Sequence, residues 1–85
     1  MTPTEALADI RGYAAANRIE TEGHARKRMR MRGVSNDDLR HALMTATGCR
    51  KQPNGRWKVD GADLDGDELT VIVVVEDGVV VVTLF

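Results

Sequence analysis

The residues best suited to chemistry lie in one run, His24–Gly33, which carries a histidine and five cationic side chains. His24, Arg28 and Arg32 are spaced four apart, so on a helix they form one stripe. Cleavage of RNA by its 2′-hydroxyl needs proton transfer and cations on the phosphate. Histidine titrates near neutral pH, and arginine binds phosphate oxygens through a planar fork. The run therefore predicts His24 and Arg28 as catalytic residues, with Arg32 and Lys27 as RNA-binding residues.

A structural role for the same run is the alternative, and spacing alone favours it. The helical wheel places His24 and Arg28 at the margin of the core, partly desolvated, with the other cations on a wetter arc. His24 would then complete the start of the helix, and Arg28 would pair with a carboxylate such as Asp63 or Asp65.

A second cationic segment, Arg50–Lys58, surrounds the only tryptophan. Asn54-Gly55 is typical of a tight hairpin turn, and a two-residue loop there pairs Gln52 with Trp57. Cations beside an aromatic ring suit contact with single-stranded RNA. The residues predicted to bind RNA here are Arg50, Lys51, Arg56, Trp57 and Lys58. The alternative places Trp57 in the core, which is the commoner fate of a tryptophan.

An acidic segment, Asp60–Glu68, follows the hairpin. Its Asp-x-Asp-x-Asp spacing is similar to a calcium loop, but the glycine stands at the wrong position and the twelfth position lacks glutamate. We therefore expect an acidic turn. The chain also lacks zinc-ligand spacing, a glycine-rich phosphate loop and a Ser-His-Asp set, so no metal and no cofactor is expected.

Hydrophobic periodicity and capping signals predict that the elements holding these residues are helices first and strands second. Thr2 and Ser35 begin capping boxes, Thr21 is a plausible N-cap, and Gly33 suits a left-handed helix end. The predicted helices cover about residues 2–17, 21–33 and 35–47. The strands predicted around the turns Asn54-Gly55 and Asp77-Gly78 are Cys49–Gln52, Arg56–Asp60, Leu69–Glu76 and Val79–Phe85.

The last two predicted strands have one core face and one mixed face. A two-residue turn at Asp77-Gly78 pairs Glu76 with Val79. The core face would then hold Val71, Val73, Val75, Val80, Val82 and Leu84. The opposite face would hold Thr70, Ile72, Val74, Glu76, Val79, Val81, Thr83 and Phe85. Its apolar members suggest docking of a partner protein or a homodimer, with cover by the first helix as the alternative.

The length and layout predict one α+β domain over residues 1–85. Two to three N-terminal helices (about 2–46) would pack on a roughly four-stranded antiparallel sheet (about 49–85). The lone Cys49 fits a reducing compartment, and we find no targeting or membrane-spanning segment. These features predict a cytoplasmic protein without a membrane contact.

The charge is divided along the chain, although the net charge is only −1. All 12 Lys and Arg residues lie between Arg11 and Lys58, whereas residues 59–85 carry acids and no base. Such asymmetry indicates a basic surface for an anionic partner. The alternative is that the two halves neutralise each other across the fold.

The chain also resembles the domain-of-unknown-function 4258 family over about Ile19–Phe85. The central motif is Thr21-x-x-His24-Ala25-x-x-Arg28-Met29-x-x-Arg32-Gly33-Val34-Ser35-x-x-Asp38-Leu39. Further matching segments are Trp57-Lys58-Val59, Asp65-Gly66-Asp67-Glu68-Leu69 and the closing valine strands.

The resemblance implies a fold similar to RelE-like ribonuclease toxins, with His24, Arg28 and Arg32 matching the family's histidine and arginines. It also implies a toxin–antitoxin pair, and hence a cognate antitoxin as partner. The sequence therefore predicts a metal-independent endoribonuclease toxin that acts on RNA. The alternative is a non-catalytic RNA- or protein-binding module.

Overall fold

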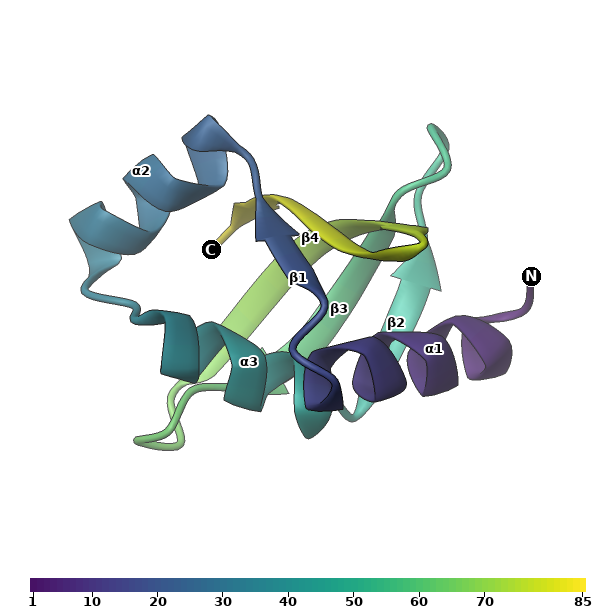
Figure 1. The fold of residues 1–85 in the computed structure, drawn as a ribbon, viewed down its shortest axis with the longest axis horizontal. Coiled ribbons are helices and arrows are strands. Elements are labelled where there is room, and N and C mark those ends of the chain that lie inside the picture. The colour runs from purple at the N-terminus through teal and green to yellow at the C-terminus, as the bar shows by residue number, and fades with distance from the viewer.

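The computed structural model describes all residues 1–85 and contains three helices and one five-stranded sheet (Figure 1). The helices are α1 (Pro3–Ala15), α2 (Gly23–Arg32) and α3 (Asn36–Met44). The strands are β1 (Ile19–Thr21), β2 (Gly48–Lys51), β3 (Trp57–Ala62), β4 (Glu68–Glu76) and β5 (Gly78–Leu84). The α+β class is thus as predicted. No helix is both long enough and apolar enough to span a membrane.

Local capping chemistry sets three of the six helix ends. Thr2 with Glu5 begins α1 and Ser35 with Asp38 begins α3, each through a reciprocal capping box, as predicted. Gly33 ends α2 in the left-handed conformation, also as predicted. The predicted N-cap of α2 was wrong: Thr21 belongs to β1, and α2 begins at Gly23 without a side-chain cap.

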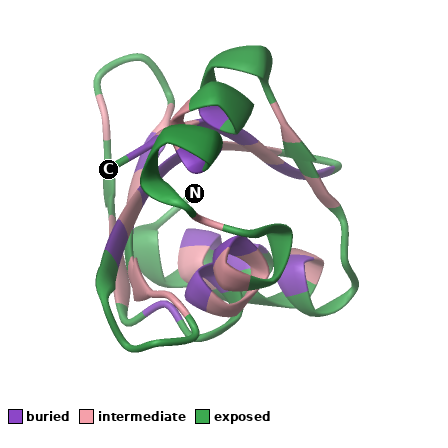
Figure 2. Ribbon diagram, turned by 90° about the vertical axis from the view of Figure 1, so that its left-hand side faces the viewer, coloured by how far each residue is buried: buried purple, intermediate pink, exposed green.

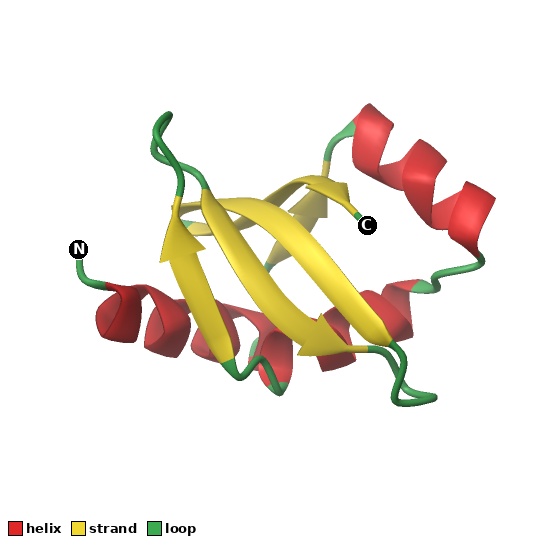
Figure 3. Ribbon diagram, turned by 180° about the vertical axis from the view of Figure 1, so that it is seen from behind, coloured by secondary structure: helices red, strands yellow, loops and turns green.

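The sheet has the order β1-β5-β4-β3-β2, and strands β2 to β5 form the predicted antiparallel meander. The prediction of four strands missed β1, which lies between α1 and α2 and pairs in parallel with β5. The sheet is therefore mixed and five-stranded. The helices α1 and α3 lie on one face, which we call the inner face, and the opposite outer face carries no helix (Figure 3).

The predicted register of the last hairpin was wrong near its turn. Glu76 pairs with Gly78, whose φ of 129° is a conformation that favours glycine. This one-residue shift turns Val79 and Val81 into the core, at 1% and 0% exposure. The outer face instead receives Val80, opposite Val74, while Val82 is left unpaired in the ladder. A bulge between Ile72 and Val73 then restores the predicted pairing of Val71 with Leu84.

The core is one cluster between the inner face and the helices. Trp57 belongs to it at 4% exposure, which confirms the core alternative for this residue. The hairpin loop is longer than predicted, because Trp57 pairs with Lys51 rather than with Gln52. Figure 2 shows that α2 is exposed around most of its surface and is buried on one side only. That side carries Ala25 and Met29.

Candidate nucleic-acid interface

The cations of α2 point into solvent because its one buried side, Ala25 and Met29, faces β5. His24 is exposed and makes no hydrogen bond, so its predicted place at the margin of the core was wrong. The exposed α2 cations that bind no protein group are Lys27, Arg30 and Arg32. The histidine and these cations are therefore accessible but not held in one geometry by the fold.

Arg28 is the exception on α2, because it is half-buried and held in place. Its Nε donates a 3.1 Å hydrogen bond to the carbonyl oxygen of Leu84. Its Cζ lies 5.5 Å from the centre of the Phe85 ring, within range of a cation–π contact. β1 pairs with β5 only as far as Val81. The Leu84 carbonyl lies beyond the end of β1, and Arg28 supplies its hydrogen-bond donor. The remaining donors of its guanidinium bind no protein group.

The alternative prediction, that Arg28 pairs with a carboxylate such as Asp63 or Asp65, was wrong. Arg28 makes no ion pair with Asp63 or Asp65. The Asp63 carboxylate instead accepts 2.9 Å hydrogen bonds from the backbone N–H groups of Asp65 and Asp67. These bonds close the predicted acidic turn, in which the three carboxylates lie within 4.8 Å of one another.

Phe85 is the residue whose role the sequence did not reveal. Its backbone exchanges two hydrogen bonds with Thr70, of 2.8 and 3.2 Å, and so extends the β4–β5 ladder by one residue. This pairing directs the Phe85 side chain to the outer face, where the residue is 50% exposed. An aromatic residue at an outer-face position beside polar neighbours was the available signal.

A hollow of about 350 Å³ lies against Phe85 on the outer face. It is lined by Gln52, Pro53, Asn54, Arg56, Ile72, Thr83 and Phe85. Residues of the loop between β2 and β3 and of the end of β5 thus line one hollow, which we call the Phe85 hollow. The Phe85 ring also contacts Arg28. Sequence reasoning predicted Arg28 and Arg56 separately. In the fold Arg28 lies against the Phe85 ring, and Arg56 lines the same hollow as Phe85.

Two further predicted residues lie on the same face. Lys58 is opposite Ile72 in the β3–β4 ladder, and Arg50 is opposite Lys58 in the β2–β3 ladder. Lys51 pairs with Trp57, so it belongs to the other side of β2, where it is exposed. Trp57 is buried and cannot stack on RNA. We call the set Arg28, Phe85, Arg56, Lys58 and Arg50 the outer-face site.

The cations of the outer-face site are not neutralised by carboxylates. The one ion pair of the protein joins Arg18 to Asp77 at 2.9 Å. The two halves of the chain therefore do not neutralise each other through contacts at α2 or at the hairpin. None of the site's cations forms an ion pair, although the exposed Asp60 lies on the same face, opposite Thr70. The guanidinium and ammonium groups can therefore still bind an anionic ligand.

Other arginines are used to satisfy carbonyl oxygens. Arg40 donates to Ala14 at 2.9 Å and to Ala15 at 2.8 Å, at the end of α1. Arg11 donates to the carbonyl oxygen of Ala46, just after α3. Arg26 donates to the carbonyl oxygen of Thr21 in β1. These hydrogen bonds tie the three side chains to the fold.

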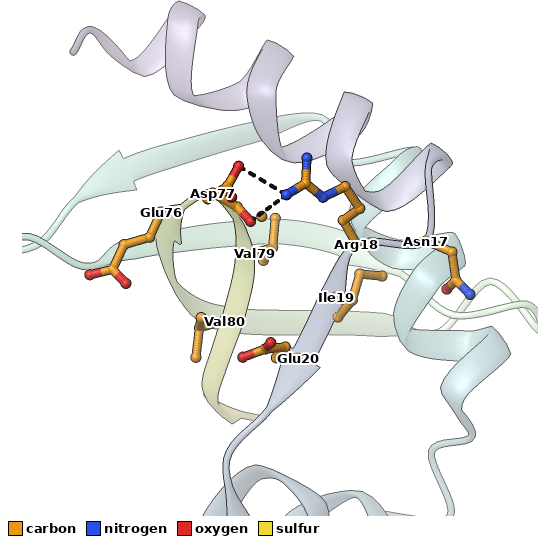
Figure 4. Close-up of a pocket in the computed structure, with 9 residues that line it drawn as sticks. Asn17, Arg18, Ile19, Glu20, Glu76, Asp77, Val79 and Val80 are labelled. Atoms are coloured by element: carbon orange, nitrogen blue, oxygen red, sulfur yellow. Dashed lines mark hydrogen bonds and ion pairs between the residues drawn. The ribbon is translucent and has the colours of Figure 1, made fainter.

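Another hollow, of about 420 Å³, lies at the other end of the sheet (Figure 4). Arg18 crosses it to the carboxylate and the carbonyl oxygen of Asp77, both at 2.9 Å, and so joins β1 to the β4–β5 turn. Glu20 and Glu76 also line it. Since its cation is paired and its free charges are acidic, this hollow is unsuited to a phosphate.

Comparison with known proteins supplies no relative. No protein-family model matches the chain, and no curated protein or solved structure matches it. The resemblance to the domain-of-unknown-function 4258 family therefore stays a prediction, carried by the motif alone.

Proposed function

We propose that this protein binds single-stranded RNA through the outer-face site. One observation carries the proposal: the Arg28 guanidinium is held over the half-exposed ring of Phe85 by the Leu84 carbonyl, with no carboxylate on it. An arginine fixed at Nε presents its remaining donors in a defined direction, which suits a phosphate.

The division of work within the site follows from its chemistry. The Phe85 ring offers a face on which a base can stack, and the cations beside it can follow the phosphate backbone. In a duplex the base faces are covered by neighbouring pairs, whereas single strands can present them. An aromatic residue flanked by cations on an open sheet face therefore favours a single-stranded ligand.

Cleavage of the bound RNA is the second candidate function, and the motif resemblance supports it. His24 lies one helical turn before Arg28 and is open to solvent, so it could exchange a proton at the 2′-hydroxyl or at the leaving 5′-oxygen. Arg28 and Arg32 would hold the phosphate. The protein would then be a metal-independent endoribonuclease toxin of the cytoplasm, with a cognate antitoxin as its partner. Binding is the first proposal because no neighbouring group orients His24.

The test of binding uses fluorescence anisotropy with a labelled 2′-O-methyl decanucleotide of mixed sequence, which cannot be cleaved through its 2′-oxygen. We expect Arg28→Met to weaken binding about tenfold, since charge-assisted hydrogen bonds contribute about 1.5–3 kcal/mol. Arg18→Met is the matched control, because it removes the same charge at the far end of the sheet. Absence of binding at low salt, or equal losses in both variants, would contradict the proposal.

The test of cleavage uses induced expression, with growth and total RNA followed over time. We expect growth arrest and RNA fragments with the natural chain, and loss of both in His24→Ala. His41→Ala, which changes the only other histidine, should retain both effects. Equal toxicity of His24→Ala and the natural chain would exclude His24 as the catalytic residue.

A further inference from the structure

We infer that the Phe85 hollow is a nucleobase site, which holds one unpaired base against the Phe85 ring and reads its edge through the Gln52 and Asn54 side-chain amides. The inference rests on the proposed RNA binding and adds sequence preference to it. Nothing in phosphate binding alone requires such a hollow, since phosphate contacts carry no base identity.

The size and lining of the hollow suit a flat heterocycle. Its volume of about 350 Å³ lies near the lower end of the range of about 300–1,000 Å³ for small-molecule sites. Ile72, Pro53 and the Phe85 ring supply apolar surface. Ile72 is only 9% exposed and belongs to the β3–β4 ladder.

Three polar side chains that line the hollow form no hydrogen bond to the rest of the protein. The backbone of Gln52 holds the hairpin loop, with its N–H donating to Arg56 at 2.7 Å and its carbonyl accepting from Gly55 at 3.2 Å. The side-chain amides of Gln52 and Asn54 and the hydroxyl of Thr83 make no hydrogen bond within the protein. Each amide offers a donor and an acceptor side by side, the pattern that pairs with a base edge.

The ring itself is fixed in position. Phe85 is held through its backbone by Thr70 and through its ring by Arg28. Arg28 contacts the ring but does not line the hollow. One nucleotide could therefore place its base in the hollow and its phosphate at Arg28, while Arg56 lies beside the base. This arrangement predicts coupling between base identity and affinity at a single position.

The experiment measures anisotropy with 2′-O-methyl decamers of A, of C and of U, and with an abasic decamer of the same length and charge. We expect at least about fivefold weaker binding of the abasic decamer, since stacking contributes about 1–3 kcal/mol per base. Phe85→Ala should lower the affinity for the base-bearing decamers to that of the abasic one. Phe85→Tyr should restore it, and Leu64→Ala, which removes another exposed apolar side chain, should leave it unchanged.

The double variant Gln52→Ala with Asn54→Ala tests the reading of the base edge. We expect the natural chain to rank the three homopolymers and the double variant to bind them within about twofold of one another. Asn36→Ala, which removes an exposed amide outside the hollow, should keep the ranking. Circular dichroism verifies that each variant is folded.

The outcomes separate the inference from the proposed function. Equal affinity for abasic and base-bearing decamers overturns the nucleobase site and leaves phosphate binding intact. A ranking that survives the double variant overturns the role of the amides. Failure of every decamer to bind at low salt overturns the proposed function itself.

Discussion

The two sides of this molecule use arginine in opposite ways. On the side of α1 and α3, Arg11 and Arg40 donate to carbonyl oxygens at helix ends. On the outer-face side, Arg50 and Arg56 bind no protein group, and Arg28 uses only its Nε. The difference teaches that the work of an arginine depends on the carbonyls within its reach. A count of charges along the sequence cannot separate the two groups.

Arg28 joins both uses in one side chain. Its Nε satisfies a carbonyl of β5, as the scaffold arginines do, and its other donors remain free, as in the hairpin. Changing Arg28 should therefore affect both RNA binding and stability. Changing Arg40 should affect stability alone, and changing Arg50 or Arg56 should affect RNA binding alone.

The largest expected effect is on the scaffold side. Arg40→Met removes the guanidinium hydrogen bonds to the carbonyls of Ala14 and Ala15, and the Ala14 carbonyl keeps only its 3.0 Å bond from the Asn17 N–H. We expect the free energy of unfolding to fall by about 1–3 kcal/mol, because hydrogen bonds from a charged group are lost at a partly buried site. Urea unfolding followed by circular dichroism measures this. RNA affinity at a temperature where the variant is folded should be unchanged, and a loss of affinity would break the division between the two sides.

A smaller effect is expected for a cation of the outer-face site. Lys58→Gln removes one phosphate contact, so it should weaken binding of all sequences alike. The slope of log affinity against log salt should fall by about 0.7, the value for one charge on a single strand. Lys27→Gln is the matched control, because Lys27 is an exposed lysine of α2 outside the outer-face site. Equal slopes for the two variants would mean that binding is spread over all exposed cations.

The smallest expected effect is acid sensitivity of the scaffold. Hydrogen bonds from the backbone N–H groups of Ser35 and Leu64 hold the pKa of the Asp38 carboxyl below its ordinary value of 3.8. A lowered folded-state pKa means that this contribution is complete at neutral pH and is lost as the pH falls through and below that value. Unfolding curves between pH 6 and pH 3 should show a weaker decline for Asp38→Asn. An identical decline in both chains would show that the Asp38 carboxyl does not contribute to the loss of stability at low pH.

The parts of the fold that depend on neighbouring residues could be predicted from the sequence. The capping boxes at Thr2 and Ser35 and the glycine end of α2 are contacts within a few residues, and all three were confirmed. The hairpin order of β2 to β5 also follows from local turns. In these places the chemistry that forms the element lies within the element.

The rest depends on contacts between distant segments. β1 has three residues and forms because β5, about 60 residues later, offers a parallel edge. The register of β5 differs from the predicted one because Glu76 pairs with Gly78 instead of Val79. The residue types around the turn do not distinguish these two pairings. Arg28 and Phe85 meet only after α2 packs on β5. The cationic segments could therefore be identified from the sequence, whereas the contact between Arg28 and Phe85 could not.

The most direct measurement is an amide and arginine side-chain NMR titration of the ¹⁵N-labelled protein with the 2′-O-methyl decanucleotide. If RNA binds at the outer-face site, the largest shifts will appear at the Arg28 Nε–H, at the Phe85 amide and around Arg56 and Lys58. The signals of α1 and α3 should stay in place. The claim is contradicted if the shifts cluster on α1 or α3, or spread evenly over every exposed cation of α2.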